Sequence, residues 1–468
     1  MSDRAMPRQV RKELCMAVGL TTTAFVGGGL IFGFSPFAKQ LTELPGSPFK
    51  PDTVADVFAI GHNITAWGCI ASGLLLDRFG PRVCAVSGLV MEATAHIFLM
   101  LAGHLPAVVT IVAYGVVGLG GTQVLLAALT FTDSFKSSAL INAALTGAFQ
   151  AGGFVFILLR FVPWERFFLI YACLALAGAL VTGFLYPDDS LPAVSRPCSI
   201  DSTGSTEMQS PPIEEGDAAT IKSDSAHGGE SKEKVRLTQL LSQPRVLLFL
   251  LTFCVAGNAV IYGSAVFLPV LQTKDLCRWD ATVTIFTDCK HQDLQDMLND
   301  VAMPLVGNFI IPVALLLGHL IDKTGFALPA FVNIFSVQAF IASLWLLGLE
   351  GQFLTLAFYN VANAAVFTIQ NAYVCAVGHD HIGTLFALTN FVLGLGNILS
   401  DWFSSNPFGE GESEVMSSLR ISSVSWLVAT SFLYVWVVLE IFYSLRLRRQ
   451  SFQEESAREA LTRYPSSC

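Results

Sequence analysis

Charged residues stand where two long hydrophobic runs end, in a similar order and about half a chain apart. The first run leads into the segment from Gly73 to Arg82, and the second leads into the segment from Gly318 to Gly325. Each segment holds an aspartate, a basic residue and a glycine, which predicts a helix that leaves a membrane and turns back at once. The residues available for chemistry in these turns are Gly73, Asp77, Arg78, Gly80, Arg82, Asp322 and Lys323.

The chemistry that these turns predict is electrostatic binding. A carboxylate at the end of one helix is attracted to the positive N-terminus of a neighbouring helix through the helix macrodipole. Such a contact closes one side of a helical bundle and breaks when that side opens, so we predict a gate. The alternative is that the charges only anchor helix ends at the membrane surface.

Neutral polar residues recur inside the hydrophobic runs at the spacing of one helix face. Because amides that face lipid are costly, we expect these residues either to line a polar path or to form hydrogen bonds between helices. Gly28 lies in a run of three glycines, which either exposes backbone groups to a solute or permits close helix packing. The candidates for binding a solute are Gly28, Gln123, Asn142, Thr146, Gln150, Asn258, Tyr262, Asn363 and Asn390.

One acidic residue is predicted to lie deep in the membrane. Glu92 falls near the middle of a hydrophobic run, and His96 follows one helical turn later on the same face. A carboxyl group at that depth is suited to carry a proton. The alternative is a local Glu–His pair that satisfies itself.

The elements that must position these residues are membrane helices. Hydrophobic residues make up 53% of the 468 and charged residues only 13%, about half the roughly 25% charged residues usual in soluble domains. A helix needs about 20 apolar residues to cross a bilayer, and the chain contains twelve such runs. We therefore predict an all-α polytopic membrane protein with 12 transmembrane helices, the first of which is retained and not cleaved as a signal peptide.

The basic residues and the polar stretches predict how the chain is organised. Most of the 27 lysines and arginines fall on the side that also holds both charged turns and both termini, so we expect that side to be cytoplasmic. A long polar stretch interrupts the helices and predicts a disordered linker. The predicted organisation is an N-terminus (1–14), a six-helix bundle (15–186), a cytoplasmic linker (187–244), a second six-helix bundle (245–445) and a cytoplasmic tail (446–468).

The charged turn carries a family resemblance. The segment from Gly73 to Arg82 resembles the loop between helices 2 and 3 of the major facilitator superfamily, although Pro81 stands where that pattern has a base. Together with Ile31-Phe-Gly-Phe-Ser35 and Gly383-Thr-Leu-Phe386, it more specifically resembles solute carrier family 43, which comprises neutral amino-acid transporters, and the apicomplexan amino-acid transporters. The resemblance implies that Asp77 meets a helix starting near Gly383 and Thr384. By symmetry, Asp322 would meet a helix starting near Ser137 and Ser138.

The resemblance also implies a function. We expect a monomeric plasma-membrane transporter that moves neutral, large or aromatic amino acids by alternating access, as sodium-independent facilitated diffusion. The predicted spans hold no paired arginines for an anion, which fits a zwitterionic solute. The alternatives are a hexose or another small polar solute, proton-coupled symport through Glu92, and a nutrient sensor that does not transport. A vacuolar or lysosomal membrane is the alternative location.

Two cysteines differ from the rest, and no enzyme signature is present. Cys277 and Cys289 fall in a predicted outer loop, where an oxidising exterior permits a disulfide; the alternative is two separate thiols. The sequence shows no zinc-binding cluster, phosphate-binding lysine loop or nucleophile elbow. We therefore expect no enzymatic activity, cofactor, metal or nucleic-acid partner; the expected partners are a small solute and the lipid bilayer.

Overall fold

The computed structural model describes residues 8–27, 37, 40–41, 49, 51–187, 237–272, 298, 302, 310–378, 381–404 and 412–446. These residues form helices and turns, and no strand occurs among them. The α-helices are α1 (Arg8–Phe25), α3 (Pro51–Met100), α4 (Ala107–Leu129), α5 (Ser138–Ala151), α6 (Trp164–Leu185), α7 (Leu237–Leu241), α8 (Pro244–Gln272), α11 (Ile311–Thr324), α12 (Ala327–Leu346), α13 (Gln352–Gly378), α14 (Ile382–Ser404) and α15 (Glu412–Phe432).

Glycine reverses the chain at both charged turns. Helix α3 is two helices joined at Gly80, which has φ 81° and is followed by Pro81. Helix α11 ends at Gly325, which has φ 78°. Both glycines stand three residues after the aspartate of their turn. A side chain disfavours these left-handed backbone angles, so glycine is what lets each helix stop and the next begin immediately.

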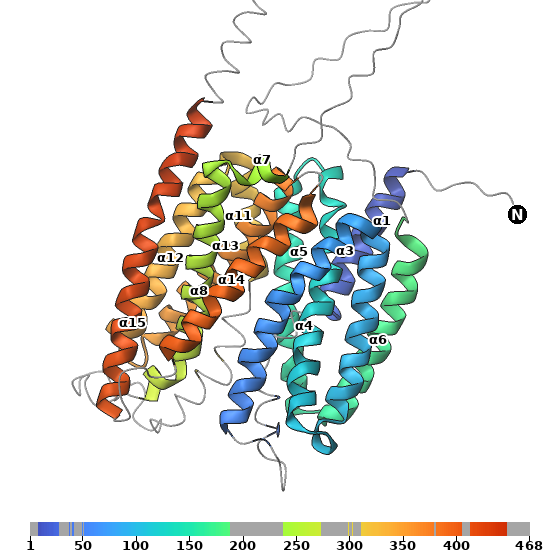
Figure 1. Ribbon diagram of the computed structural model, residues 1–468, viewed down its shortest axis with the longest axis horizontal. Helices are drawn as coiled ribbons and strands as arrows, with labels where there is room; N and C mark the ends of the chain where they lie inside the picture. Colours follow the sequence, from blue (N-terminus) through green and yellow to red (C-terminus); the bar gives the residue numbers. More distant parts are fainter. Residues whose placement is uncertain are drawn as a thin grey trace, which may run out of the picture.

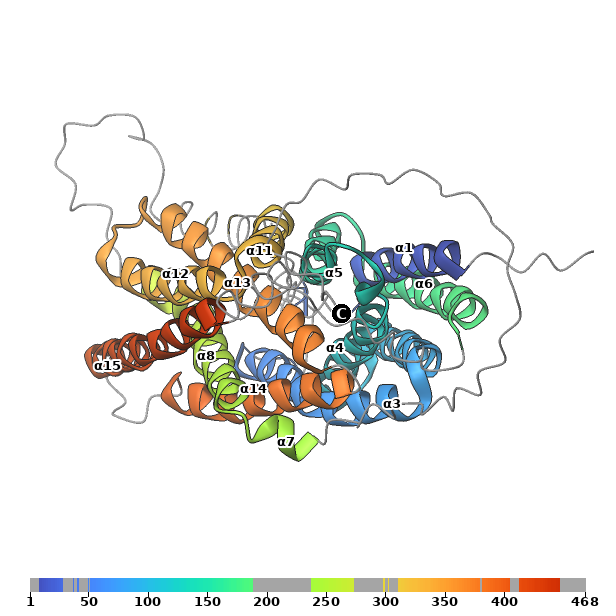
Figure 2. The same ribbon diagram turned by 90° about the horizontal axis from the view of Figure 1, so that it is seen from above.

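The helices form two groups that lie side by side. Viewed from above, α1 and α3 to α6 make up one group, and α8 and α11 to α15 make up the other (Figure 2). Because α3 contains two helices, each of the twelve predicted spans corresponds to a helix or helical half in the described residues. The start of α1 and the end of the helix that continues from α15 lie at the same end of the molecule (Figure 1).

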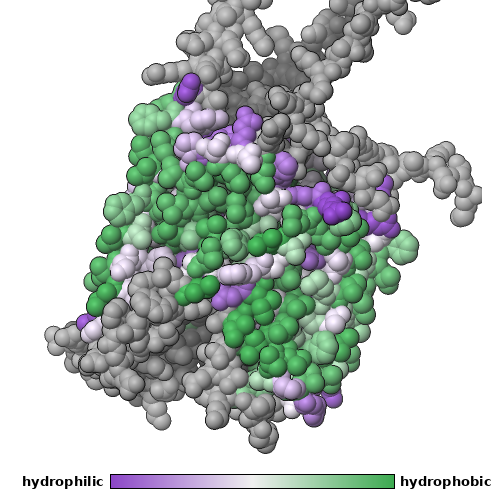
Figure 3. Space-filling model, in the orientation of Figure 1, coloured by the Kyte–Doolittle hydropathy of each residue, from purple (hydrophilic) through white to green (hydrophobic). Residues whose placement is uncertain are grey.

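The surface of the molecule fits a lipid environment. Hydrophobic residues cover most of the described part of the face that Figure 3 shows, with hydrophilic residues near its upper and lower edges. Large apolar side chains such as Phe184 (83% exposed) and Leu346 (81% exposed) are not buried inside the protein. An apolar surface of this extent is not tolerated in water, which fits an integral membrane protein.

Eight helices among the described residues are long and apolar enough to cross a membrane. The difference from twelve has local causes. The span Ile60–Met100 contains two helices joined by a turn, and the Ile382–Ile398 segment is a shorter apolar helix. Helix α11 has only 14 residues, and α1 carries four charged residues at its start. Both short helices pack against a helix of the other group: α11 lies against α5, and α14 lies against α3 (Figure 2).

An ion pair fastens the second group of helices together. The guanidinium of Arg245, at the start of α8, binds both carboxylate oxygens of Glu440 with nitrogen–oxygen distances of 2.5 and 2.8 Å. Arg245 also lies over the rings of Tyr443 and Tyr373, with its central carbon 4.1 and 5.4 Å from their centroids. Glu440 is 1% exposed, so this bidentate pair compensates for charges that would otherwise be buried alone.

Candidate functional site

The first charged turn binds the N-terminus of a helix from the other group. One carboxylate oxygen of Asp77 accepts a hydrogen bond from the backbone N–H of Gly383 at 3.0 Å. The other oxygen accepts from the backbone N–H and the hydroxyl of Thr384, at 2.8 and 2.5 Å. These donors lie in the first turn of α14, where backbone N–H groups have no partner inside the helix. Asp77 therefore joins α3 to α14 through the position that the helix dipole favours for an anion.

The second charged turn makes the corresponding contact in the opposite direction. The two oxygens of Asp322, near the end of α11, accept hydrogen bonds from the backbone N–H groups of Ala139 and Leu140 at 3.2 and 3.1 Å. Ala139 and Leu140 are the second and third residues of α5, as Gly383 and Thr384 are of α14. Each group of helices thus offers one carboxylate and one helix N-terminus to the other.

Close backbone packing accompanies both contacts. A Cβ atom on Gly73 would lie 2.1 Å from the carbonyl oxygen of Gly383, and one on Gly318 would lie 2.5 Å from the Cβ of Ala143. No side chain fits at such separations, so glycine at 73 and 318 allows α3 to approach α14 and α11 to approach α5. These contacts hold the two groups of helices together at the end of the molecule that carries the charged turns.

Among the other residues of the two turns, Arg78 lies with its guanidinium carbon 5.4 Å from the centroid of the Phe79 ring. Lys323 stands in the last turn of α11, where a cation complements the negative end of the helix dipole. Gly80 and Gly325 set the backbone angles of the turns. The gating role of this set stays a prediction.

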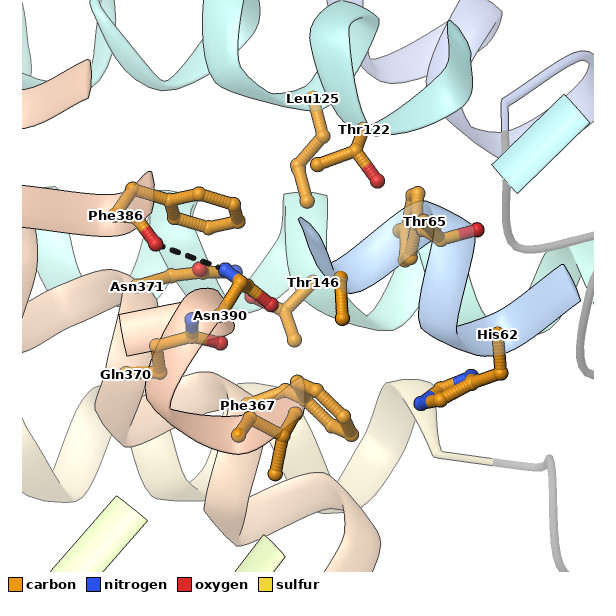
Figure 4. A pocket seen from close by; sticks show the side chains of 13 residues that line it. His62, Thr65, Thr122, Leu125, Thr146, Phe367, Gln370, Asn371, Phe386 and Asn390 are labelled. Carbon is orange, nitrogen blue, oxygen red and sulfur yellow. Dashed lines mark hydrogen bonds between the residues drawn. The ribbon is translucent and has the colours of Figure 1, made fainter. Parts of the chain in front are cut away.

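A cavity lies between the two groups of helices. It has a volume of about 50 Å³, and its lining side chains come from α3, α4 and α5 on one side and from α13 and α14 on the other (Figure 4). The lining is made of hydroxyls, amides, aromatic rings, aliphatic groups and one imidazole. The 13 lining residues are His62, Thr65, Ala66, Thr122, Leu125, Thr146, Phe149, Phe367, Gln370, Asn371, Phe386, Asn390 and Leu393.

Hydrogen bonds cross the boundary between the groups beside this cavity. The side-chain amide of Asn371 on α13 donates to the hydroxyl oxygen of Thr146 on α5 at 2.7 Å. One turn along both helices, the Cys375 sulfur lies 3.8 Å from the amide oxygen of Asn142. These contacts must break when α5 and α13 separate. Together with the two aspartate contacts at the charged turns, they link the two groups of helices on one side of the cavity.

Two of the predicted binding residues line the cavity. Thr146 faces it from α5, and Asn390 faces it from α14 while its amide donates to the carbonyl of Phe386 at 3.0 Å (Figure 4). Gln150 lies one turn beyond Thr146 on the same face of α5. It is 1% exposed, and neither of its amide atoms has a hydrogen-bond partner among the described residues. Asn363 is buried one turn before Phe367, which is a lining residue.

The remaining predicted binding residues lie outside the cavity lining. The amide of Gln123 accepts from Ser87 and donates to Ser72 inside the first group. Asn142 takes part in the Cys375 contact between α5 and α13. These two amides therefore serve the packing between helices, which was the alternative expectation for polar residues in the spans.

The two predicted residues of α8 also face other helices. Asn258 donates to the backbone carbonyl of Leu393 on α14 at 3.2 Å. The hydroxyl of Tyr262 lies 3.4 Å from that of Ser423, and its ring packs near Trp426 with centroids 6.3 Å apart. Tyr262 thus contacts α15 and not the cavity lining. Gly28, Cys277 and Cys289 lie outside the described residues.

Several lining residues were absent from the sequence-based set. Gln370 directly precedes Asn371 and donates to the hydroxyl of Thr389 at 2.7 Å. Thr122 directly precedes Gln123 and lies on the cavity side of α4. His62 carried a usable signal, because an ionisable residue inside a hydrophobic run marks a functional position by default. Thr65 carried no such signal in the sequence, because a lone threonine in a membrane helix commonly bonds to the backbone of its own helix. Thr65 does so here, at the carbonyl of Gly61.

Glu92 and His96 are both fully buried in the second half of α3. Neither carboxylate oxygen of Glu92 and neither ring nitrogen of His96 has a hydrogen-bond partner among the described residues. The two side chains therefore do not satisfy each other in this structure. The rings of Phe168 and Tyr171 pack on His96, each with a centroid separation of 5.7 Å.

Comparison with known proteins places this geometry in a family. The sequence model of the Major Facilitator Superfamily matches residues 73–400. The structure is similar to the crystal structure of the human organic anion transporter MFSD10 (TETRAN), with a TM-score of 0.53 and 15% identity, covering 94% of this chain and all of that one. Protein FMP42 of Saccharomyces cerevisiae is 29% identical over 126 residues, which is 25% of each chain. The matched part is thus about a quarter of that protein.

Proposed function

This chain belongs to the major facilitator superfamily and is an integral membrane transporter, and we propose that it carries neutral amino acids with large or aromatic side chains. Transport proceeds by alternating access, without sodium, as facilitated diffusion. The observation that carries the proposal is the lining of the cavity between the two groups of helices. The solute specificity rests on that lining and on the resemblance of three sequence segments to neutral amino-acid transporters.

The lining offers what a zwitterion with an apolar side chain requires. Thr65, Thr146 and Asn390 bring neutral hydrogen-bonding groups to the cavity, while Phe367 and Phe386 bring aromatic surface. Neutral dipoles suffice for a solute that carries its own opposite charges, and aromatic rings give apolar side chains a surface to pack on. The buried, unpartnered amide of Gln150 adds a donor and an acceptor close to this space.

An anionic solute fits this lining less well. The relative MFSD10 is an organic anion transporter, and anions are commonly bound by arginine or lysine. None of the 13 lining residues is an arginine or a lysine. A hexose would be satisfied by the same neutral hydroxyls and amides, so aromatic packing is the feature that favours an amino acid.

Binding requires the two groups of helices to move apart. Pockets for small molecules usually have volumes of about 300–1,000 Å³, whereas this cavity measures about 50 Å³. The closed contacts of Asp77 and Asp322 lie at one end of the same boundary. Opening at that end breaks the aspartate contacts and the bond between Asn371 and Thr146, which widens the cavity. The aspartate contacts and the bond between Asn371 and Thr146 together form the gate of the proposed cycle.

The proposal is tested with the full chain in liposomes. We expect saturable uptake of radiolabelled leucine and phenylalanine that is unchanged when choline replaces sodium, and competition by large neutral amino acids but not by glucose or an aromatic carboxylate anion. Asn390→Ala should weaken competition by phenylalanine. Thr21→Val, in α1, should leave it unchanged, because the hydroxyl of Thr21 bonds to its own helix, at the carbonyl of Ala17. Uptake of an organic anion but of no amino acid would contradict the assignment. Specific binding without flux would indicate a sensor.

Two further properties belong to the proposal. We propose that the protein works as a monomer in the plasma membrane; helices of one chain form the lining of the cavity. A tag at residue 1 or 468 should be inaccessible to antibody in intact cells, since both termini are proposed to be cytoplasmic. Labelling of either tag without permeabilisation would contradict that orientation, and retention of the protein in vacuoles or lysosomes would contradict the location.

A further inference from the structure

The side chains that line the cavity change in chemistry along the molecule. Thr146 stands seven residues after Ala139 on α5, and Asn390 stands seven residues after Gly383 on α14. Ala139 and Gly383 are donors to the two aspartates, so Thr146 and Asn390 lie about 10 Å from the charged turns along their helices. The bond from Asn371 to Thr146 places Asn371 at the same level. Thr146, Asn371 and Asn390 thus form a polar layer of the cavity.

Aromatic rings follow on the side away from the charged turns. Phe149 stands three residues after Thr146 on α5, and Phe367 stands four residues before Asn371 on α13. Helix α5 runs away from the charged turns and α13 runs toward them, so both rings lie about one helical turn beyond the polar layer. Phe149 belongs to the first group of helices and Phe367 to the second, so the space between the rings widens when the groups separate.

A second polar group lies beyond the rings. His62 stands fifteen residues before Asp77 in the first half of α3, or about 22 Å from the charged turns along the helix axis. Figure 4 shows the same order, with the amides of Asn371 and Asn390 on one side, His62 on the other, and the ring of Phe367 between them. The cavity therefore has a polar end, an aromatic middle and a second polar end.

The polar layer is suited to bind an ammonium group. The side-chain amide oxygen of Asn371 is buried and has no hydrogen-bond partner among the described residues. The hydroxyl of Thr122 donates to the carbonyl of Gly118 at 2.8 Å, which leaves its oxygen as an acceptor. A buried acceptor without a donor is costly, and a solute ammonium brings three donors. The head of an amino acid therefore fits at this end of the cavity.

We propose that the cavity binds an aromatic amino acid lengthwise and that His62 bonds to a polar group at the tip of its side chain. The ammonium group lies at Asn371 and the ring lies between Phe149 and Phe367. The polar layer and His62 are about 12 Å apart along the helix axes, a gap that tyrosine spans with a hydrogen bond at each end.

The imidazole of His62 and a phenol hydroxyl are complementary. A neutral imidazole offers one N–H donor and one acceptor nitrogen, and a phenol hydroxyl both donates and accepts. A site that binds a substrate hydroxyl discriminates against the analogue that lacks it. His62 is thus a specificity-determining residue that favours tyrosine over phenylalanine. The inference rests on the proposed function and narrows its solute class.

The test compares tyrosine with phenylalanine, because the two solutes differ only by the hydroxyl. With the full chain in liposomes, we expect tyrosine to half-saturate uptake at a concentration about tenfold lower than phenylalanine does. Equal concentrations, or a lower one for phenylalanine, would overturn the inference and leave the proposed function standing. A chain that moves neither solute, nor leucine, would instead overturn the proposed function.

Substitutions at position 62 assign the preference to the imidazole. His62→Leu removes both hydrogen-bonding atoms, so we expect the two half-saturating concentrations to become about equal, whereas His62→Gln keeps a donor and an acceptor and should retain part of the preference. His104→Leu is the matched control, because His104 is exposed in the turn between α3 and α4. A His62→Leu variant that keeps the wild-type ratio would overturn the inference. His62→Phe, which keeps a ring without the nitrogens, gives the same comparison if His62→Leu does not fold.

Discussion

The two aspartate contacts are interactions of the same type, one made by each group of helices, and they differ in the number and length of their hydrogen bonds. Asp77 accepts three hydrogen bonds from the start of α14, at 2.5 to 3.0 Å. Asp322 accepts two from the start of α5, at 3.1 and 3.2 Å. In both cases the donors are the second and third residues of the helix. The additional bond of Asp77 comes from the side chain of Thr384. The equivalent position of α5 holds Leu140, whose side chain has no donor.

This difference shows which features belong to the repeated architecture and which belong to single residues. The position of each carboxylate follows from the helix end, the turn glycine and the close approach of the two helices, and these are shared. The number of donors depends on the third residue of the partner helix, and it differs. We therefore expect the Asp77 contact to contribute more to the closed state, and four substitutions test this expectation.

Asp77→Asn should have the largest effect. The amide keeps the size of the side chain but loses the charge and one acceptor oxygen, and hydrogen bonds to a charged group contribute about 1.5–3 kcal/mol each. Since 1.4 kcal/mol corresponds to a factor of ten, we expect the end of the molecule that holds the charged turns to open at least about tenfold more often than in the wild type. Cys375 is the reporter, because it is buried beside Asn142 at the boundary between the groups. Its labelling by a membrane-impermeant thiol reagent is followed in a variant with no other cysteine.

Leucine turnover of Asp77→Asn should fall while the amount of protein in the membrane stays near normal. Glu165→Gln is the matched control, because Glu165 is an exposed acid in the first turn of α6. Unchanged Cys375 labelling together with wild-type turnover in a correctly inserted Asp77→Asn variant would remove the gating role and leave the charged turns as anchors.

Asp322→Asn should have the same kind of effect but a smaller one. Within the described part of the chain, two backbone donors face this carboxylate, and both distances exceed 3.0 Å. We expect Cys375 labelling to rise about three- to tenfold, which corresponds to about 1 kcal/mol. An effect of Asp322→Asn equal to or larger than that of Asp77→Asn would show that donor number does not rank the two contacts.

Thr384→Val isolates the additional donor. The substitution keeps the side-chain shape and both backbone N–H groups, and it removes only the hydroxyl that bonds Asp77 at 2.5 Å. We expect labelling of Cys375 to rise about fivefold, which brings the Asp77 contact close to the strength of the Asp322 contact. Thr21→Val serves as the control. No change in labelling would mean that the hydroxyl bond adds nothing to the closed state.

Leu140→Thr is the reverse exchange and should have the smallest effect. It places a hydroxyl at the third residue of α5, where α14 has Thr384, within the same helical turn that faces Asp322. We expect Cys375 labelling to fall about twofold, because a new bond on a partly exposed surface contributes well under 1 kcal/mol. A rise in labelling would indicate that the loss of Leu140 packing outweighs the new donor.

The sequence by itself determined the class of the protein and the nature of its turns. Twelve apolar runs with few charges dictate membrane helices, because only helices satisfy the backbone inside a bilayer without neighbours. The spacing between Asp77 and Gly80, repeated at Asp322 and Gly325, predicted two abrupt reversals, and both glycines adopt positive φ. These inferences succeeded because they depend on local composition and local backbone sterics.

The tertiary structure decided which polar residues face the cavity. Gln123, Thr146, Tyr262 and Asn390 are all polar residues in apolar spans, yet only Thr146 and Asn390 line the cavity, whereas Gln123 and Tyr262 bond to neighbouring helices. Helical periodicity shows which residues share a face, but the rotation of each helix against its neighbours depends on close contacts such as that of Gly73 with Gly383. The partners in those contacts are about three hundred residues apart in the chain, so no local pattern specifies them.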